Sequence, residues 1–367
     1  MRNDDLLTGV HNLLVTCGGM KRGETLFVLH EGAEDRYYDS AIVEAVRQGA
    51  DLLGIKTVIK EAPFSPEVSD PHPDMVHEMN AADRTLFLAR MGDQIRFRES
   101  MARIRPIVSY ALDAEMLGSS FGRADYRAFV ALKDAVNTCL YNAKEIKVTC
   151  PLGTDFTGVQ TDDPAVVADV TVTRFPMSVF TPVPAQNFTG RIAQKGFLVG
   201  TGSQYYDPYA CALEGVLTIH FDGNQITGFD GLPEDIETAK NHYEHVGEKY
   251  DIDRHFVHSW HVGIHPGCNF TQPVSACFKR WSGGAFGNPR LLHFHTCGAY
   301  APGEISLNVL DPTVCIDGIN LWENGRFYPE RMPGGKKVLE AFPDVREVFD
   351  NPAQGCGQGA DGQLSYT

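Results

Sequence analysis

The stretch TLFVLHEGAEDRYYDSAIVEAVRQGADLLGIKTVIK, residues 25–60, predicts the fold of the first part of the chain. It opens with a short apolar run, Thr25–His30, which follows a turn at Gly23 and is typical of a strand. Residues 37–53 carry apolar side chains at helical spacing, and residues 56–60 are typical of a second strand. A strand, a helix and a strand at this interval predict two parallel strands joined by a crossover helix.

The same alternation continues to about residue 145. Residues 85–89 and 106–111 predict a third and a fourth strand. Helical spacing fills the gaps, at about residues 74–82, 93–104 and 125–142. We therefore expect residues 1–145 to form a Rossmann-like α/β domain with a doubly wound parallel sheet. No G-x-G-x-x-G follows the first strand and the chain contains no Walker sequence, so no motif supports a dinucleotide or ATP.

Beyond residue 145 the sequence alternates at period two, which is typical of antiparallel strands. Residues 167–173 predict one strand, and residues 214–221 and 225–229 flank Asp222-Gly223-Asn224, a strong hairpin signal. An amphipathic helix is expected at 233–249 and a last hairpin at 313–325. We expect residues 146–367 to form an α+β domain with a mainly antiparallel sheet, joined to the first domain by a tight junction near residues 145–152. The tail beyond about residue 350 has few residues to pack, so we expect it to be loose or to dock on a neighbouring subunit.

Charge and composition exclude several classes of protein. The formal net charge is −15 and no stripe of Lys and Arg offsets it, which argues against a nucleic-acid partner. No apolar run approaches about 18 residues, so we expect no membrane span. The start MRNDD lacks the pattern of a secretory signal, and the nine cysteines contain no C-x-x-C pair. These features predict a cytoplasmic protein with reduced thiols, although a thiolate ligand or nucleophile near the histidines stays open.

Histidines gather in one part of the second domain, where eight of the thirteen lie between positions 242 and 295. His293 and His295 are two apart in an apolar run, so on a strand both imidazoles point to the same side and can reach one ion. His261 and His265 are four apart, but the glycines and the proline around them favour a strand that ends in a turn. Any one of these histidines is more often a surface or hydrogen-bonded core residue, but the cluster as a whole favours a metal site.

A second candidate site follows the third predicted strand, at residues 90–97 (RMGDQIRF). In open parallel sheets, ligands gather beyond the carboxyl ends of the strands. Arg90 and Arg96 are therefore candidates to bind a substrate carboxylate or a partner subunit. The alternative is a solvated helix start, with Asp93 near the positive end of the helix dipole.

This layout resembles the aminopeptidase T superfamily of metallo-aminopeptidases, and within it the 2,5-dihydroxypyridine 5,6-dioxygenase branch. The resemblance covers most of the chain and is most specific from Gly231 onward. Residues 261–267 (HVGIHPG) are similar to the histidine-glycine segment that supplies one iron ligand in that branch, and residues 287–288 and 315–318 follow in family order. The resemblance implies that His261 is a ligand of Fe(II) and that the protein is a homo-oligomer.

The other metal ligands of that branch have no counterparts at the matching positions of this sequence. The dioxygenases place a His-x-Asp pair on the strand before the last hairpin, where this chain has Ser306-Leu307-Asn308. A serine hydroxyl and a neutral amide are poor ligands for divalent iron. Either the ion is lost, or it has moved to side chains close by. His293 and His295, with Glu304 as a carboxylate, are the substitutes that we infer.

Three hypotheses about function follow. The first is a non-haem Fe(II), extradiol-type dioxygenase that opens a small hydroxylated N-heteroaromatic ring. Its iron is held by His261, His293, His295 and Glu304. His258 and His265 move protons with pKa values near neutrality. The second is a hydrolase, either a cyclic amidase or an aminopeptidase-like enzyme, with zinc or with no metal. The few acids near the histidines disfavour a two-metal peptidase. The third is a non-catalytic homologue that keeps only the fold.

Overall fold

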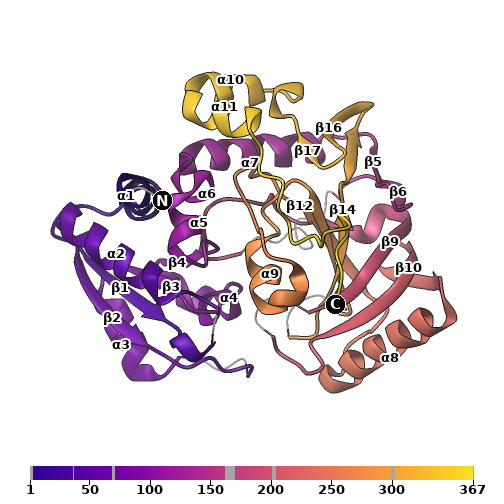
Figure 1. Ribbon diagram of the computed structural model, residues 1–367, viewed down its shortest axis with the longest axis horizontal. Coiled ribbons are helices and arrows are strands. Elements are labelled where there is room, and N and C mark those ends of the chain that lie inside the picture. The colour runs from indigo at the N-terminus through magenta and orange to yellow at the C-terminus, as the bar shows by residue number, and fades with distance from the viewer. Residues whose placement is uncertain are drawn as a thin grey trace. The chain divides into compact units, whose positions relative to one another are not determined.

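The computed structural model describes residues 3–35, 37–67, 71–161, 170–200, 204–298 and 302–366. Its contacts divide the chain into two compact units. The first unit contains Met1–Val130 and Val170–Met177, and the second contains Ala131–Asp169 and Ser178–Thr367. Figure 1 draws the chain from indigo at the amino terminus to yellow at the carboxyl terminus.

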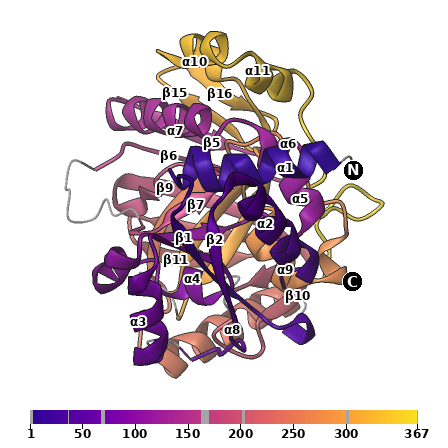
Figure 2. The same cartoon turned by 90° about the vertical axis from the view of Figure 1, so that its left-hand side faces the viewer.

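The first unit is built on a five-stranded sheet in the order β2-β1-β3-β4-β7, and every neighbouring pair is parallel. The prediction of a parallel α/β sheet is therefore confirmed (Figure 2). The middle strands are buried on both faces, because helices cover both sides. The strands are β1 Thr25–His30, β2 Lys56–Glu61, β3 Arg84–Leu88, β4 Pro106–Ser109 and β7 Thr173–Phe175.

Local signals explain the crossover helix between β1 and β2. The helix α2, Ser40–Leu53, begins where the Asp39 side chain accepts a hydrogen bond from the amide of Ala41. It ends at Gly54, whose φ of 71° is the left-handed conformation that glycine adopts without strain. The other helices of this unit are α1 Asn3–His11, η1 Asn12–Cys17, η2 Ala33–Asp35, α3 Pro73–Ala81, α4 Met91–Gln94, η3 Glu99–Ile104, α5 Ala114–Gly118 and α6 Ser120–Arg123. The helix α7, Tyr126–Tyr141, continues into the second unit.

The predicted helix at 93–104 is wrong. The chain forms the short helix α4 and then the 3-10 helix η3, with a break between them. At this break the carbonyl of Arg96 accepts hydrogen bonds from the amide of Thr171 at 2.7 Å and from its hydroxyl at 3.0 Å. Because the carbonyl of Arg96 is bonded to Thr171, it does not accept the hydrogen bond that a continuous helix would place there.

The strand predicted at 167–173 also differs. Residues 167–169 lie outside the described part of the chain, and the observed strand β7 lies farther on, at Thr173–Phe175. It pairs in parallel with β4, in the sheet of the first unit, through Ile107 opposite Thr173. The chain therefore returns to the first unit after it has entered the second.

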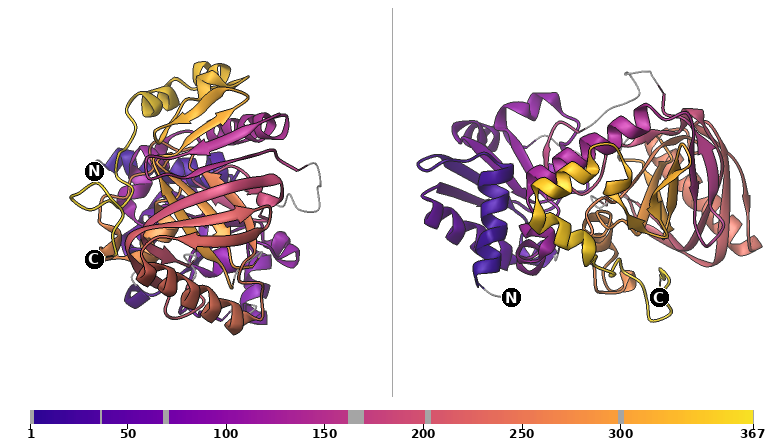
Figure 3. Two further views of the ribbon diagram at one scale, coloured as in Figure 1. Left: turned by 90° about the vertical axis from the view of Figure 1, so that its right-hand side faces the viewer. Right: turned by 90° about the horizontal axis from the view of Figure 1, so that it is seen from above.

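The second unit carries a twelve-stranded sheet whose described pairs are all antiparallel, as predicted for a mainly antiparallel sheet (Figure 3). The order is β17-β16-β15-β5-β6-β9-β14-β13-β12-β8, and β10 joins β9 to the edge strand β11. The strands are β5 Ile146–Thr149, β6 Asp155–Gly158, β8 Val183–Pro184, β9 Phe188–Val199, β10 Ala210–Asp222, β11 Gln225–Asp230, β12 Val257–Val262, β13 Leu291–Thr296, β14 Ile305–Leu310, β15 Thr313–Ile316, β16 Ile319–Glu323 and β17 Arg326–Phe327.

The predicted hairpin and helix of this unit are both observed. Asp222 pairs with Gln225 across the turn between β10 and β11. The helix α8, Pro233–Tyr250, follows, and its Asp235 carboxylate accepts from the amides of Glu214 and Gly215 at 2.9 and 2.8 Å. These two bonds hold the first turn of α8 on the irregular part of β10. The remaining helices are η4 Ala185–Asn187, η5 Val274–Ala276, α9 Phe278–Gly284, η6 Pro329–Arg331, α10 Gly335–Ala341 and α11 Pro343–Asp350. None of the described helices is long and apolar enough to cross a membrane.

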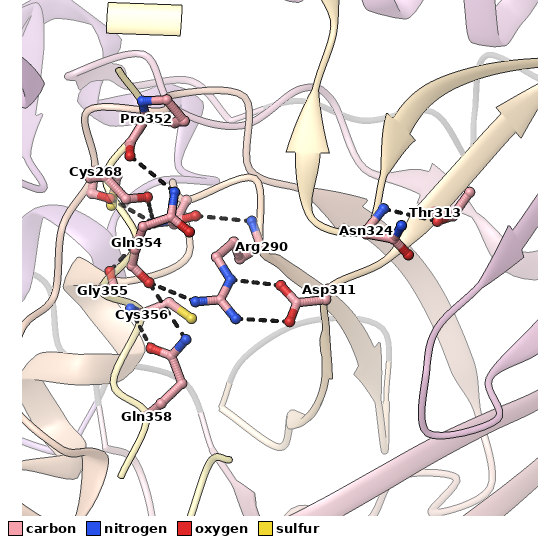
Figure 4. Close-up of polar contacts among 12 residues, drawn as sticks. Cys268, Arg290, Asp311, Thr313, Asn324, Pro352, Gln354, Gly355, Cys356 and Gln358 are labelled. Atoms are coloured by element: carbon pink, nitrogen blue, oxygen red, sulfur yellow. Dashed lines mark hydrogen bonds and ion pairs between the residues drawn. The ribbon is translucent and has the colours of Figure 1, made fainter. Parts of the chain in front are cut away.

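The carboxyl-terminal tail packs on its own unit, which corrects the expectation that it is loose. The amide of Ala353 donates to the carbonyl of Pro266 at 2.7 Å, and the indole of Trp281 donates to the carbonyl of Cys356 at 2.7 Å. Arg290 holds Asp311 through two bonds of 2.6 and 2.8 Å and also donates to the carbonyl of Gln354 at 2.7 Å (Figure 4). Arg290 precedes β13 and Asp311 follows β14, so this pair ties together the ends of two neighbouring strands.

Candidate metal centre

His261 of β12 and His293 and His295 of β13 lie on one face of the sheet, beside the neighbouring strand β14. His261 is opposite His293, which is opposite Asn308. In the adjacent row, His295 lies between Ser259 and Ser306. Because side chains alternate between the faces of a sheet, these polar residues share one face.

The alternate positions carry the aromatic core. Trp260 is opposite Phe294, and both are completely buried. Their rings meet Phe156 edge-on at centroid distances of 5.5 and 5.0 Å. The same strands therefore pack the core with one face and position the histidines with the other, which makes the histidine positions rigid.

Three imidazoles converge on this polar face. The Nε2 atoms of His261 and His293 face each other, and Nε2 of His295 lies 3.2 Å from Nε2 of His261. All three potential ligand atoms lie within 4.8 Å of one another. Within the part of the chain that the structure describes, these three histidines are a group of side chains able to share one metal ion.

The backbone selects the tautomer of His261. Its Nδ1 lies 3.2 Å from the carbonyl oxygen of Phe180, which only accepts hydrogen bonds, so Nδ1 carries the proton. The lone pair is then on Nε2, which faces the other two histidines. This arrangement, with the distal nitrogen donating to a carbonyl, is how metal-binding histidines are oriented.

His293 is buried, as His261 is. Burial, followed by the neighbouring His261 and His295, holds the pKa of His293 well below its usual range, so the ring is neutral at neutral pH. Its ring stacks on Phe286 with 4.1 Å between centroids. Neutral imidazole is the form that binds metals.

This donor set fits a metal ion. Nε2 of His261 presents a lone pair to two other ring nitrogens, and facing nitrogens need a proton or a cation between them. None of the acids in the described residues belongs to the group, so it offers three imidazole nitrogens. Three histidines are the ligands of one type of catalytic zinc site, and imidazole also suits iron and copper.

Glu304 lies outside this group of three nitrogens. It is buried just before β14, and its backbone carbonyl accepts a hydrogen bond from the hydroxyl of Tyr206 at 2.9 Å. Burial lowers the pKa of His258, and the charge of Glu304 opposes part of that shift. The role of Glu304 as a metal ligand stays a prediction.

The two histidines predicted to move protons have different surroundings. His258 is partly buried, its ring lies parallel to that of His295, and its Nδ1 is 2.8 Å from the hydroxyl oxygen of Ser259. Burial lowers its pKa to about 4, so the expectation of a value near neutrality is corrected for this residue. His265 is completely buried in the turn after β12, where its Nδ1 accepts from the amide of Gly267 at 3.2 Å.

The two arginines predicted to bind substrate lie in the first unit. Arg90 follows β3, is 2% exposed and is held by both carboxylate oxygens of Glu31, which follows β1, at 2.8 to 3.0 Å. The face of Phe64 covers its guanidinium. Arg96 donates to Asp93 at 2.5 Å. Acids of the same unit bind both guanidinium groups, and a role in substrate binding stays a prediction.

Sequence reasoning missed the residues that support the histidines. Ser259 lies two positions before His261, and its hydroxyl lies 2.8 Å from Nδ1 of His258 and 3.5 Å from Nδ1 of His295. Phe180 comes from a distant segment and shows no signal in the sequence. The alternation of β12 identifies Ser259 once its strand is predicted, because residues two apart share a face.

No protein-family model and no curated protein matches the chain. Among solved structures, the chain is similar to 2,5-dihydroxypyridine dioxygenase from Pseudomonas putida KT2440, with a TM-score of 0.58, 14% sequence identity, and 89% of this chain and 98% of that chain covered. It is also similar to wild-type AmpT from Thermus thermophilus, with a TM-score of 0.47, 9% identity, and 89% of this chain and 100% of that chain covered. At such identities the first likeness shows a shared fold, and a fold alone does not define a reaction.

Proposed function

We propose that His261, His293 and His295 bind one divalent transition-metal ion and that the protein is a metal-dependent enzyme acting on a small molecule. The observation that carries this proposal is the convergence of three Nε2 atoms on one sheet face. The tautomer of His261 and the lowered pKa of His293 support it, because both leave ring nitrogens able to donate a lone pair at neutral pH.

Within this proposal we favour a ring-opening Fe(II) dioxygenase for a hydroxylated N-heteroaromatic compound. The fold shared with a protein named as 2,5-dihydroxypyridine dioxygenase supports this choice. When bound, Fe(II) would supply a Lewis acid for the hydroxylated ring and electrons for dioxygen.

The surrounding residues suit such a substrate. Phe286, partly exposed beside His293, offers an aromatic surface against which a planar ring can stack. Burial lowers the pKa of His258 to about 4, so the ring is neutral at pH 7 and can accept a hydrogen bond from a substrate hydroxyl. Ser259 holds His258 through its hydroxyl and fixes the direction of that ring.

A metal-dependent hydrolase is the second candidate, as a cyclic amidase or an aminopeptidase-like enzyme. The observation that favours it is the set of three imidazole nitrogens with no carboxylate of the described residues among them, since three histidines are a known ligand set of catalytic zinc. A two-metal peptidase centre is disfavoured, because no acid of the described residues joins the group.

Metal analysis and oxygen uptake test the proposal. We expect the purified protein to hold about one metal ion per chain, and His293→Ala and His295→Ala to lose it. His220→Ala is the matched control, because His220 is partly exposed and lies outside the group. Iron with oxygen uptake on hydroxypyridines identifies the dioxygenase, and zinc with amide hydrolysis identifies the hydrolase. Equal metal content in the wild type and both histidine variants contradicts the site.

A further inference from the structure

A groove with a volume of about 670 Å³ lies in the second unit, between the edge strand β11 and the helix α8. The loop that carries Arg254 and His255 closes one end. None of the three converging histidines lines it. Its volume lies within the range of about 300–1,000 Å³ that is typical of sites for small molecules.

The groove follows a strand edge that is only partly covered. β11 pairs with β10 on one side. On the other side, its first residues meet the loop, where Gln225 bridges Phe256 and the amide of Ile226 donates to the carbonyl of His255 at 2.8 Å. Beyond Ile226, the described residues provide no further strand on this side, so the space beside Thr227–Phe229 is open to a ligand.

The wall of the groove is aromatic. Tyr243 of α8 and Phe229 of β11 contact each other with 5.8 Å between ring centroids. The hydroxyl of Tyr243 is paired with the hydroxyl of Thr296 at 2.6 Å and the side chain is only 1% exposed, so Tyr243 supports the ring of Phe229 rather than meeting a ligand itself. Phe229 is only partly buried, and its exposed surface lies in the groove. An apolar or aromatic ligand body would cover this surface.

The rim of the groove carries positive charge that acids do not fully balance. Arg254 donates to Glu244 at 2.7 Å, and these two charges offset each other. Lys240 is exposed and has no ion-pair partner among the described residues, and the exposed ring of His255 adds a hydrogen-bond donor. An uncompensated ammonium group in a chain of formal charge −15 marks a place for an anion.

From these features we propose that the groove between β11 and α8 binds a small organic carboxylate with an aromatic or apolar body, at a site separate from the three histidines. Lys240 and His255 hold the carboxylate, and Phe229, supported by the buried ring of Tyr243, packs against the body. The proposal does not depend on the function of the histidine centre, because none of its residues lines the groove.

Isothermal titration calorimetry with benzoate and hexanoate tests this site. Metal-free protein is used, so that neither probe binds through a metal ion. We expect at least one carboxylate to bind and benzyl alcohol, which has no charge, to bind roughly ten-fold more weakly than benzoate. Lys240→Gln is expected to weaken carboxylate binding roughly ten-fold, and Phe229→Ala to weaken it several-fold.

Lys249→Gln is the matched control, since Lys249 lies on the same helix but does not line the groove. Thermal unfolding of each variant checks that the fold is intact. The proposal is overturned if neither carboxylate binds at concentrations up to about 10 mM. It is also overturned if Lys240→Gln, with its fold intact, binds both probes as the wild type does. Either of these results would leave the proposed metal site at the three histidines unaffected, because the two sites share no residue.

Discussion

Two buried polar clusters of this protein differ in how their groups are balanced. In the first unit, Arg90 and Glu31 meet beyond the carboxyl ends of β3 and β1, where parallel sheets often bind ligands, and each charge has an opposite partner. In the second unit, three imidazoles face one another, and no acid of the described residues lies among them. In an ion pair the two opposite charges compensate each other. Three nitrogens whose lone pairs face one another, by contrast, are stabilised by a cation between them. From this difference we propose a structural role for the first cluster and a metal-binding role for the second.

The largest effect is expected from breaking the buried ion pair between Arg90 and Glu31. Arg90→Met leaves the carboxylate of Glu31 buried without its cation, and we expect the free energy of unfolding to fall by about 3–5 kcal/mol. Urea unfolding measures this loss, and metal content is expected to stay unchanged. The double variant Glu31→Leu with Arg90→Met should recover part of the loss, because no charge is then buried alone. A loss below about 1 kcal/mol in the single variant would refute the structural role.

The next effect concerns the cluster of three histidines, His261, His293 and His295. His293→Ala removes one of three ligands, and we expect metal affinity to fall by at least about 100-fold, more than loss of a supporting residue costs. Competition with a chelator measures the affinity, and His220→Ala is expected to match the wild type. The free energy of unfolding of the metal-free variant should change far less than that of Arg90→Met. The opposite ranking would reverse the roles of the two clusters.

A histidine outside both clusters sharpens the comparison. His242 is buried against Tyr206, and burial lowers its pKa to about 4. An unfolded histidine titrates near 6.5, so between about pH 6.5 and pH 4 only the unfolded chain holds this proton. The free energy of unfolding of the metal-free protein should therefore fall as the pH is lowered through this window, by about 2 kcal/mol from His242.

The variant His242→Gln isolates this contribution, because glutamine does not titrate. Urea unfolding at several pH values should show a shallower dependence than in the wild type. His77→Gln, a change at an exposed histidine, provides the control. Identical pH dependence in the wild type and His242→Gln would mean that the ring is not held neutral by burial.

The smallest effect is expected from a change at Ser259, whose hydroxyl supports the histidine cluster. Ser259→Ala removes the hydroxyl that lies between Nδ1 of His295 and Nδ1 of His258, and we expect metal affinity to fall about ten-fold. Ser306→Ala is the matched control, because Ser306 lies on the same face but donates to Asn308. Chelator competition distinguishes the two variants. An equal loss in both would mean that the sheet face, rather than the Ser259 hydroxyl, supports the ligands.

Local periodicity determined much of the fold from the sequence alone. The strand-helix-strand pattern of residues 25–60, the β10–β11 hairpin and the helix α8 appear where they were predicted. Each depends on signals within one segment, such as the Asp39 cap of α2 or the Asp-Gly-Asn turn. The spacing of His293 and His295 likewise showed that both rings share one face of a strand.

Only the tertiary structure showed which residues of distant segments lie opposite or contact one another. The register of β12 on β13 places His261 opposite His293, and the carbonyl of Phe180 selects the tautomer of His261. Glu31 binds Arg90 from 59 residues away, and β7 returns to the first sheet. These contacts depend on strand register and burial, which no local spacing encodes, and they determine which buried polar groups are balanced and which are left to bind a ligand.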